Sequence, residues 1–249
     1  MLRKIYGALL ASKWTSTQAR LGWGYFRYKL LGGDAYWDVL HVIRDRRCDL
    51  FLDIGMHHGI YTDIILKKCP HVRIIGFEPT PETYGFLHEK YLHSPEVKVL
   101  NCALGEKNGS SLFFCNDNEQ TNSLLEEGAD SGVMGDMMHR KRQVDVSVRC
   151  LDSVLVELGE TASIFAKIDI QGAEALLLAG ASIAFEKQIE GCLLEIQLKD
   201  MYKGQANFVS ILELMGKRGF EIRQIYPPMV VGGVAVQVEV LFVKTSKNI

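Results

Sequence analysis

The chain has 249 residues and a formal net charge of −2, with 47% hydrophobic and 23% charged residues, which is typical of a soluble globular protein. Its length suffices for one large α/β domain with a full core. The charge balance lacks the basic excess that neutralises phosphates, so no nucleic-acid partner is expected. No run of 18 apolar residues occurs, which argues against a membrane-spanning helix.

Six cysteines are scattered along the chain without a Cys-x-x-Cys pair or a Cys/His cluster at zinc spacing. This pattern favours reduced, buried thiols in a cytoplasmic protein, and it predicts no metal centre of the zinc-finger type. The cysteines are Cys48, Cys69, Cys102, Cys115, Cys150 and Cys192.

Residues 1–33 contain six basic residues, six Trp, Tyr or Phe residues and no acid. We expect one or two helices packed on the main domain, with the aromatic residues in the interface. The alternative is peripheral contact with an anionic membrane surface. Gly32-Gly33 ends the segment and Asp34 is a predicted N-cap, so a single domain is expected over residues 34–249.

Apolar strand patterns and helical patterns alternate through most of the chain. This order predicts a mainly parallel sheet with helices on both faces, and the short final connection makes the last strand antiparallel. Strands are expected at residues 50–54, 73–77, 97–101, 164–170, 192–196, 221–226 and 234–243, and helices at 61–68, 81–92, 151–158, 175–179 and 208–218.

The middle of the chain departs from this alternation. Asn108-Gly109 is typical of a two-residue hairpin turn. Residues 116–143 are polar and predict a long loop, either a lid or disordered, in which residues 121–124 form an anchored island. An exposed strand is expected at 144–148.

Two acids and two glycines follow the first two strands. Asp53 ends the first strand and precedes Gly55-x-x-x-Gly59, while Glu78 ends the second. The turn offers backbone N–H groups at a helix N-terminus, as nucleotide sites require. Its spacing differs from the dinucleotide fingerprint, which disfavours an NAD-dependent oxidoreductase. A carboxylate at the position of Glu78 can accept both hydroxyls of a ribose.

Five motifs in order identify a resemblance. They are Asp53-x-Gly55-x-x-x-Gly59, Phe77-Glu78-Pro79, Ala103-Leu104-Gly105, Leu151-Asp152-Ser153 and Lys167-Ile168-Asp169-Ile170-Gln171-Gly172-Ala173-Glu174. Together these motifs resemble the FkbM-type family of S-adenosylmethionine-dependent methyltransferases over residues 48–225. The resemblance implies a class I methyltransferase fold: a Rossmann-like α/β three-layer sandwich whose mainly parallel seven-stranded sheet has an antiparallel last strand.

The resemblance also implies residue roles around S-adenosylmethionine. Gly55 and Gly59 would admit its methionine part, with Asp53 orienting that turn or reaching the amino group. Glu78 would bind the ribose hydroxyls. Asn101 and Ala103, at the end of the third strand, would border the adenine. Asp169, at the end of the fourth strand, would face the methyl donor and the acceptor.

This chain departs from the family in two places. It has Met56-His57 where the family usually has Ala-Asn, and Gln171 where the family usually has Glu. His57 or His58 would serve as the base for a hydroxyl acceptor. The other interpretation is that one histidine packs on the cofactor and its neighbour is solvated.

Metal assistance is a further alternative. Asp169, Glu174 and Glu195 are candidates for a divalent cation site. Lys167 and the following helix N-terminus offer a different way to neutralise these acids, and no metal site is the favoured interpretation.

The expected activity is O-methylation of a hydroxyl on a small molecule, sugar or glycoconjugate. The alternative is a non-catalytic nucleoside-binding module of the same fold that acts as a scaffold or membrane-associated partner. Neither the acceptor nor an oligomeric state is indicated by the residues.

Overall fold

The computed structural model describes residues 35–245, apart from the side chains of residues 135–137 and 141. The predicted N-terminal segment 1–33 and the N-cap Asp34 lie outside the described residues, so the expected domain division stays a prediction.

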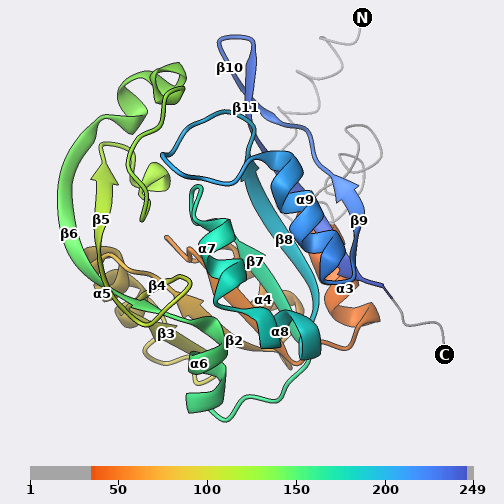
Figure 1. The fold of residues 1–249 in the computed structure, drawn as a ribbon. Helices are drawn as coiled ribbons and strands as arrows, with labels where there is room; N and C mark the ends of the chain where they lie inside the picture. The colour runs from red at the N-terminus through yellow and green to blue at the C-terminus, as the bar shows by residue number, and fades with distance from the viewer. Residues whose placement is uncertain (1–34, 246–249) are drawn as a thin grey trace, which may run out of the picture.

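The main sheet has eight strands in the order β10-β11-β8-β7-β1-β2-β3, with β9 paired to the outer side of β11 (Figure 1). Strands β3, β2, β1, β7 and β8 are parallel, whereas β11 is antiparallel to both β8 and β9. The predicted class I arrangement is therefore confirmed, with β10 as an additional short strand. The strands are β1 (Leu50–Ile54), β2 (Arg73–Phe77), β3 (Val97–Leu100), β7 (Ile164–Ile168), β8 (Ile189–Gln197), β9 (Phe220–Ile225), β10 (Met229–Val231) and β11 (Val234–Lys244).

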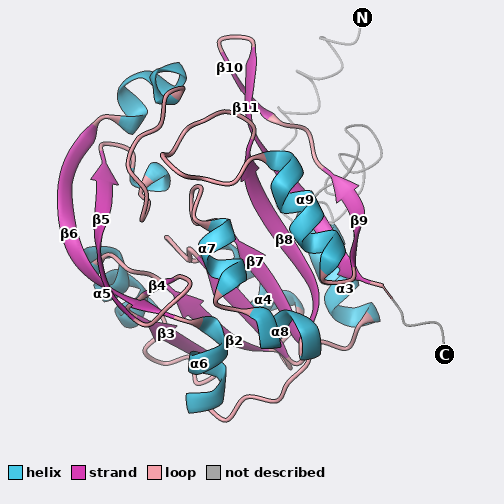
Figure 2. Ribbon diagram, in the orientation of Figure 1, coloured by secondary structure: helices cyan, strands magenta, loops and turns pink. Residues whose placement is uncertain are grey.

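Helices cover both faces of this sheet (Figure 2). Side chains of α3 (Ala35–Asp45) and α4 (Ile60–Lys68) pack in one hydrophobic cluster, and α5 (Pro81–Lys90) joins a smaller cluster beside it. The other face packs against α6 (Leu151–Glu157), α7 (Glu174–Ala179), α8 (Ser182–Lys187) and α9 (Phe208–Lys217). The central strands β1 and β7 are buried along their whole length, as their largely hydrophobic sequences indicate, whereas the edge strand β3 is only partly buried.

The segment between β3 and α6 forms a second sheet with the order β4-β6-β5. It consists of β4 (Ala103–Leu104), β5 (Gly109–Asn116) and β6 (Arg140–Arg149), joined by the 3-10 helices η1 (Glu119–Thr121) and η2 (Ser131–Met138). The expected long loop over residues 116–143 contains η1, η2 and the first residues of β6, so its disordered alternative is wrong. The polar residues between β5 and β6 form η1, η2 and the turns around them, and such short elements leave no strand or helix periodicity in the sequence.

The expected hairpin at Asn108-Gly109 is also absent from the described residues, because β4 and β5 pair with opposite edges of β6. The Asn108 side chain instead accepts a hydrogen bond from the backbone N–H of Cys150 at 2.7 Å. A two-residue hairpin does join β10 to β11, where Gly232 and Gly233 have φ values of 57° and 83°.

All six cysteines are free, and five of them are buried, in line with the expected reduced thiols. Across residues 35–245, we find no helix with the length and apolar character needed to span a bilayer.

Candidate functional site

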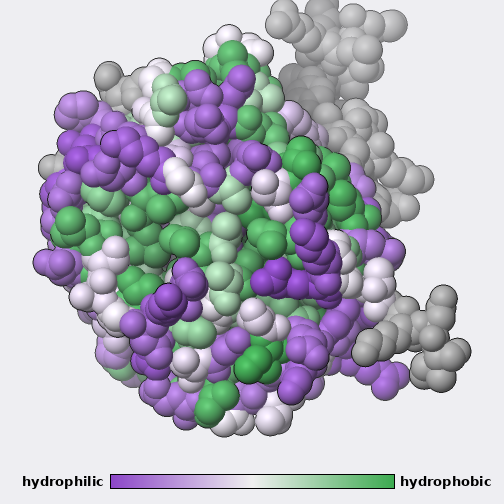
Figure 3. All heavy atoms as spheres, in the orientation of Figure 1, coloured by the Kyte–Doolittle hydropathy of each residue, from purple (hydrophilic) through white to green (hydrophobic). Residues whose placement is uncertain are grey.

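A cavity of about 280 Å³ lies where the carboxyl ends of β1, β2 and β7 meet, which is where open α/β sheets bind ligands. Loops after these strands form one side, and residues 118–122, which include η1, form another. Figure 3 shows one face of the molecule, where apolar residues gather over β5 and hydrophilic residues border them. Seven of the predicted site residues line the cavity: Asp53, Gly55, His57, His58, Glu78, Ala103 and Asp169.

The turn after β1 requires glycine for reasons of backbone conformation and packing. Gly55 and Gly59 both have φ of +73°, in the left-handed region that favours glycine. A Cβ on Gly55 would overlap the carbonyl oxygen of Asp169, and one on Gly59 would overlap the hydroxyl of Tyr91. Gly55 lines the cavity, whereas Gly59 is outside its lining and packs against Tyr91, just after α5.

Glu78 is a buried acid that lines the cavity. Its carboxylate accepts hydrogen bonds from the backbone N–H groups of His57 (3.1 Å) and Thr80 (3.0 Å) and from the Thr80 hydroxyl. A carboxylate offers about four acceptor positions, so capacity for another donor remains. Burial raises the pKa of Glu78, and the three hydrogen bonds oppose that rise.

Lys167 links the ends of β1 and β7. Its ammonium donates to the carbonyl oxygen of Gly55 at 2.9 Å and lies 3.2 Å from Oδ2 of Asp169. Burial alone favours the neutral amine, but Asp169 and Asp53 outweigh it and raise the pKa of Lys167.

Asp53 lies beneath this pair and accepts a 2.7 Å hydrogen bond from the Thr62 hydroxyl. Burial raises the pKa of Asp53 to about 6, against the attraction of Lys167. Two contacts therefore hold the backbone turn after β1. Asp53 accepts a hydrogen bond from Thr62 of α4, and Lys167 of β7 donates one to the carbonyl oxygen of Gly55.

Gln171 connects two carboxylates at the edge of the cavity. Its amide nitrogen donates to Oδ1 of Asp169 at 2.9 Å and to Oε1 of Glu195 at 2.6 Å. Asp169 is thus held from one side by Lys167 and from the other by Gln171, and its side chain remains 32% exposed. Gln237 donates to the second oxygen of Glu195 at 2.7 Å.

The structure does not gather Asp169, Glu174 and Glu195 into a cation site. The only group of three potential ligands found among the described residues is a different one. Glu174 turns back to the start of its own helix and accepts from the Gly172 N–H at 3.1 Å, while amides surround Glu195. This alternative of the sequence interpretation is wrong because both glutamates already have protein partners.

His57 and His58 lie side by side on the turn, with ring centroids 4.0 Å apart. Burial and the neighbouring His58 lower the pKa of His57, which favours its neutral form. Nε2 of His57 lies 4.0 Å from Oε2 of Glu119, and the rings of His58 and Phe86 are perpendicular, with centroids 5.4 Å apart. Both histidines therefore belong to the cavity.

The end of β3 contributes in two different ways. Ala103 lines the cavity with Cys102 and Leu104 and gives it an apolar wall. Asn101 stands outside that wall, where its amide donates to the carbonyl oxygens of Glu78 and Pro79 at 2.9 and 3.0 Å. Asn101 is thus placed to position the end of β2, and the described cavity does not include it.

Several residues that line the cavity have no sequence pattern that identifies them as site residues. Glu119 and Gln237 lie on a polar segment and on an edge hairpin, far along the chain from the glycine turn. The expected anchored island is confirmed, because Ser123 donates from its hydroxyl to the carbonyl oxygen of Gln171 at 2.7 Å and bridges to Phe114. That anchor brings the neighbouring Glu119 to the cavity.

The cavity has an excess of acids. Of the described residues that line it, Lys167 is the one lysine or arginine, against five acids. These are Asp53, Glu78, Glu119, Asp169 and Glu195. Such a site favours a ligand that carries positive charge.

Comparison with known proteins supplies a family. The model of the methyltransferase FkbM domain matches residues 53–222. The 31-O-demethyl-FK506 methyltransferase FkbM of Streptomyces tacrolimicus is 24% identical over 88% of this chain and 90% of its own length. The 2-O-methyltransferase NoeI of Sinorhizobium fredii (strain NBRC 101917 / NGR234) is 23% identical over 76% of this chain and 79% of its own.

Another relative is Methyltransferase 1 of Beauveria bassiana (strain ARSEF 2860), 24% identical over 79% of this chain and 81% of its own length. Among solved structures, magnesium protoporphyrin IX methyltransferase from Synechocystis PCC 6803 with bound SAM superposes with a TM-score of 0.45. It is 13% identical and covers 89% of this chain and 91% of its own.

Proposed function

The chain belongs to the FkbM family of S-adenosylmethionine-dependent methyltransferases, and we propose that it methylates a hydroxyl oxygen of a small molecule, sugar or glycoconjugate. The observation that carries the choice of acceptor is Asp169. This carboxylate faces the cavity while Lys167 and Gln171 fix both of its oxygens. A carboxylate held in this way can accept a hydrogen bond from a hydroxyl and orient it.

The names of two relatives support the same acceptor class. The FkbM relative is a 31-O-demethyl-FK506 methyltransferase and the NoeI relative is a 2-O-methyltransferase. Oxygen methylation in both suggests a hydroxyl acceptor here.

The described residues fit S-adenosylmethionine. When bound, it supplies a methyl group made electrophilic by the adjacent sulfonium. Glu78 has acceptor capacity for a ribose hydroxyl, and the acid excess favours the sulfonium charge. Phe77, Cys102 and Leu104 provide an apolar surface suited to a flat base.

The chain's own contribution is alignment. Methyl transfer is an in-line displacement, so holding the acceptor oxygen opposite the leaving sulfur supplies much of the acceleration. In this proposal Asp169 orients the hydroxyl and the cavity wall excludes water. His57 and His58 place imidazole nitrogens in the same cavity, where a neutral nitrogen can accept the hydroxyl proton.

Calorimetry with S-adenosylhomocysteine tests the cofactor site. The wild type should bind, and Glu78→Gln should weaken binding by roughly tenfold or more, the equivalent of one lost charge-assisted hydrogen bond. Glu96→Gln, which removes an exposed acid before β3, is the matched control and should bind like the wild type. Equal binding by Glu78→Gln would remove Glu78 from the proposed site.

Labelled S-adenosylmethionine offered with alcohols, sugars and oligosaccharides tests the acceptor class, with matched amines and RNA as comparisons. We expect label in an O-methyl product and none in RNA. Transfer only to nitrogen or RNA would overturn the proposal. Binding of S-adenosylhomocysteine without transfer to any acceptor in a cell extract would favour the non-catalytic binding module.

A further inference from the structure

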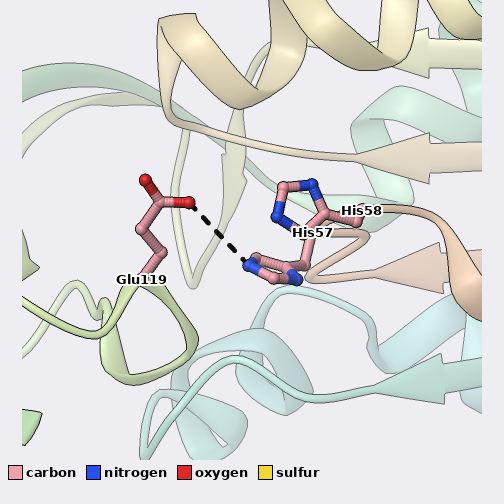
Figure 4. Close-up of side chains that lie close together, drawn as sticks. All are labelled: His57, His58 and Glu119. Carbon is pink, nitrogen blue, oxygen red and sulfur yellow. Dashed lines mark ion pairs between the residues drawn. The ribbon is translucent and has the colours of Figure 1, made fainter.

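Two segments distant in the chain bring metal-ligating side chains together at the cavity. His57 and His58 lie on the turn after β1, and Glu119 opens η1 (Figure 4). One ligand atom from each side chain lies within 4.8 Å of the others. The Glu119 carboxylate points toward the imidazole of His57 and lies 4.0 Å from its Nε2.

We propose that His57, His58 and Glu119 bind a divalent transition-metal ion of the zinc class, and that this ion holds the acceptor's hydroxyl oxygen. The assignment of the acceptor rests on the proposed function, whereas binding of the metal does not. It gives the two histidines a role different from that of a general base.

The types of ligand atom indicate which class of metal ion the site would bind. Two imidazole nitrogens and one carboxylate oxygen suit Zn²⁺ and its transition-metal neighbours, while Mg²⁺ and Ca²⁺ prefer oxygen ligands. Three protein ligands leave a tetrahedral ion one open position, as in catalytic zinc sites. Because all three residues line the cavity, that position is open to a bound molecule.

Rotation of side chains is enough to bring the three ligand atoms to the separations that a bound ion requires. Ligand atoms around a tetrahedral zinc lie roughly 3.4 Å apart, since each bond is about 2.0–2.2 Å. The Glu119 side chain is 60% exposed, and that of His57 is 28% exposed. Glu119 can therefore move by the required ångström without disturbing the core.

The backbones that carry the ligands are already held in place. The N–H of His57 donates to Glu78 at 3.1 Å, and the ammonium of Lys90 donates to the carbonyl oxygen of His58 at 2.8 Å. On the other segment, the Asn118 side chain caps η1, and Thr121 is buried behind Glu119. Pre-organised backbones reduce the ordering cost of binding an ion.

The charge of the cavity favours a cation at this place. Glu119 pairs with no lysine or arginine among the described residues. A bound dication would supply the positive charge that this carboxylate lacks.

The ion would assist the reaction by lowering the pKa of the coordinated hydroxyl. The acceptor oxygen gives its proton to solvent and stays on the ion. It then forms the O–C bond as the methyl–sulfur bond breaks, and the bonding electron pair remains on sulfur as a neutral thioether. Every atom and charge of this step comes from the acceptor, the methyl donor and water.

The test uses the full chain after treatment with a chelator, with Zn²⁺ titrated against a chromophoric competitor. We expect one equivalent to bind to the wild type, and Glu119→Gln and His58→Gln each to weaken binding at least tenfold. Mg²⁺ should not compete at equal concentration. The matched control is Asp117→Asn, an exposed acid two residues before Glu119 that pairs with His139, and it should bind like the wild type.

Calorimetry with S-adenosylhomocysteine separates this proposal from the proposed function. Chelator-treated wild type should still bind S-adenosylhomocysteine after its Zn²⁺ has been removed. Absence of Zn²⁺ binding by the wild type, or equal binding by wild type and both variants, overturns the metal site and leaves the methyltransferase proposal standing. Zn²⁺ binding that depends on Glu119, with O-methylation unaffected by its loss, confirms the site and overturns its role toward the acceptor.

Discussion

The hydroxyl of Tyr202 donates to Oε1 of Gln171 at 2.8 Å and so sets the direction of the Gln171 amide. With its oxygen occupied, the amide turns its nitrogen toward Asp169 and Glu195. Gln171 has φ of +53° and is buried, so this orientation is built into a constrained loop. The neutral amide of Gln171 thereby lies between the carboxylates of Asp169 and Glu195, which would otherwise face each other.

Gln171→Glu should destabilise the protein at pH 8, because a third carboxylate would replace the donor that both acids use. We expect a loss of about 1–3 kcal/mol in the free energy of unfolding, as for a buried polar group left without its partner. The loss should shrink at pH 5, where a buried carboxyl is more easily protonated. Denaturant unfolding at both pH values measures it.

Gln143→Glu is the matched control, since Gln143 is exposed on β6, and it should change stability little at either pH. Equal stability of Gln171→Glu and wild type at pH 8 would show that the amide is not needed between the acids.

Gly55→Ala should destabilise the protein and weaken S-adenosylhomocysteine binding. The left-handed backbone costs a Cβ-bearing residue roughly 1–2 kcal/mol, and the new Cβ would also overlap the Asp169 carbonyl oxygen. A total of at least about 2 kcal/mol is expected from thermal or denaturant unfolding.

Gly85→Ala on α5 is the opposite case, because a Cβ there meets no atom within 4 Å. It should stabilise the helix by about 0.5–1 kcal/mol and leave ligand binding unchanged. A similar effect of the two substitutions would contradict the packing argument.

The strands of the parallel core were predictable because burial on both faces makes them continuous apolar runs. Leu50–Ile54 and Arg73–Phe77 match their predicted bounds. Asp53, Glu78 and Asp169 were predictable for the same reason, since each lies at or just after the carboxyl end of such a strand. Parallel strands bring these ends to one edge of the sheet.

The parts that sequence reasoning missed have contacts that are distant along the chain. β6 is a ten-residue strand of largely polar sequence whose register depends on β5, so no local periodicity marks it. Glu119 reaches the cavity only because Ser123 and Thr121 anchor its segment near Gln171 and Tyr202. A polar residue in a polar segment carries no sign of such a position.

Lys167→Met should strongly destabilise the protein at neutral pH. The substitution removes the positive charge that opposes the raised pKa of Asp53, and it removes the ion pair with Asp169. Removing one partner of a buried ion pair costs about 3–5 kcal/mol. Lys67→Met, an exposed position on α4, is the control and should cost little.

Adding Asp53→Asn to Lys167→Met should recover part of the loss, because the buried acid beneath Lys167 would then be neutral. A double-mutant cycle in denaturant measures the coupling between the two residues. Strictly additive effects would show that the two side chains do not interact.

Because of Glu174, the free energy of unfolding should fall as the pH rises from 4.5 through about 7. Burial raises its pKa from 4.5 to about 7, so the folded state holds a proton that the unfolded state releases above pH 4.5. The stabilisation from this group is present below pH 4.5 and is lost as the pH rises through about 7. At about 1.4 kcal/mol for each pKa unit, the contribution is about 3 kcal/mol.

Glu174→Gln should flatten this part of the profile of stability against pH, whereas Glu213→Gln at an exposed site on α9 should retain it. Denaturant unfolding from pH 4.5 to 8 measures both, and parallel profiles for wild type and Glu174→Gln would contradict the assignment.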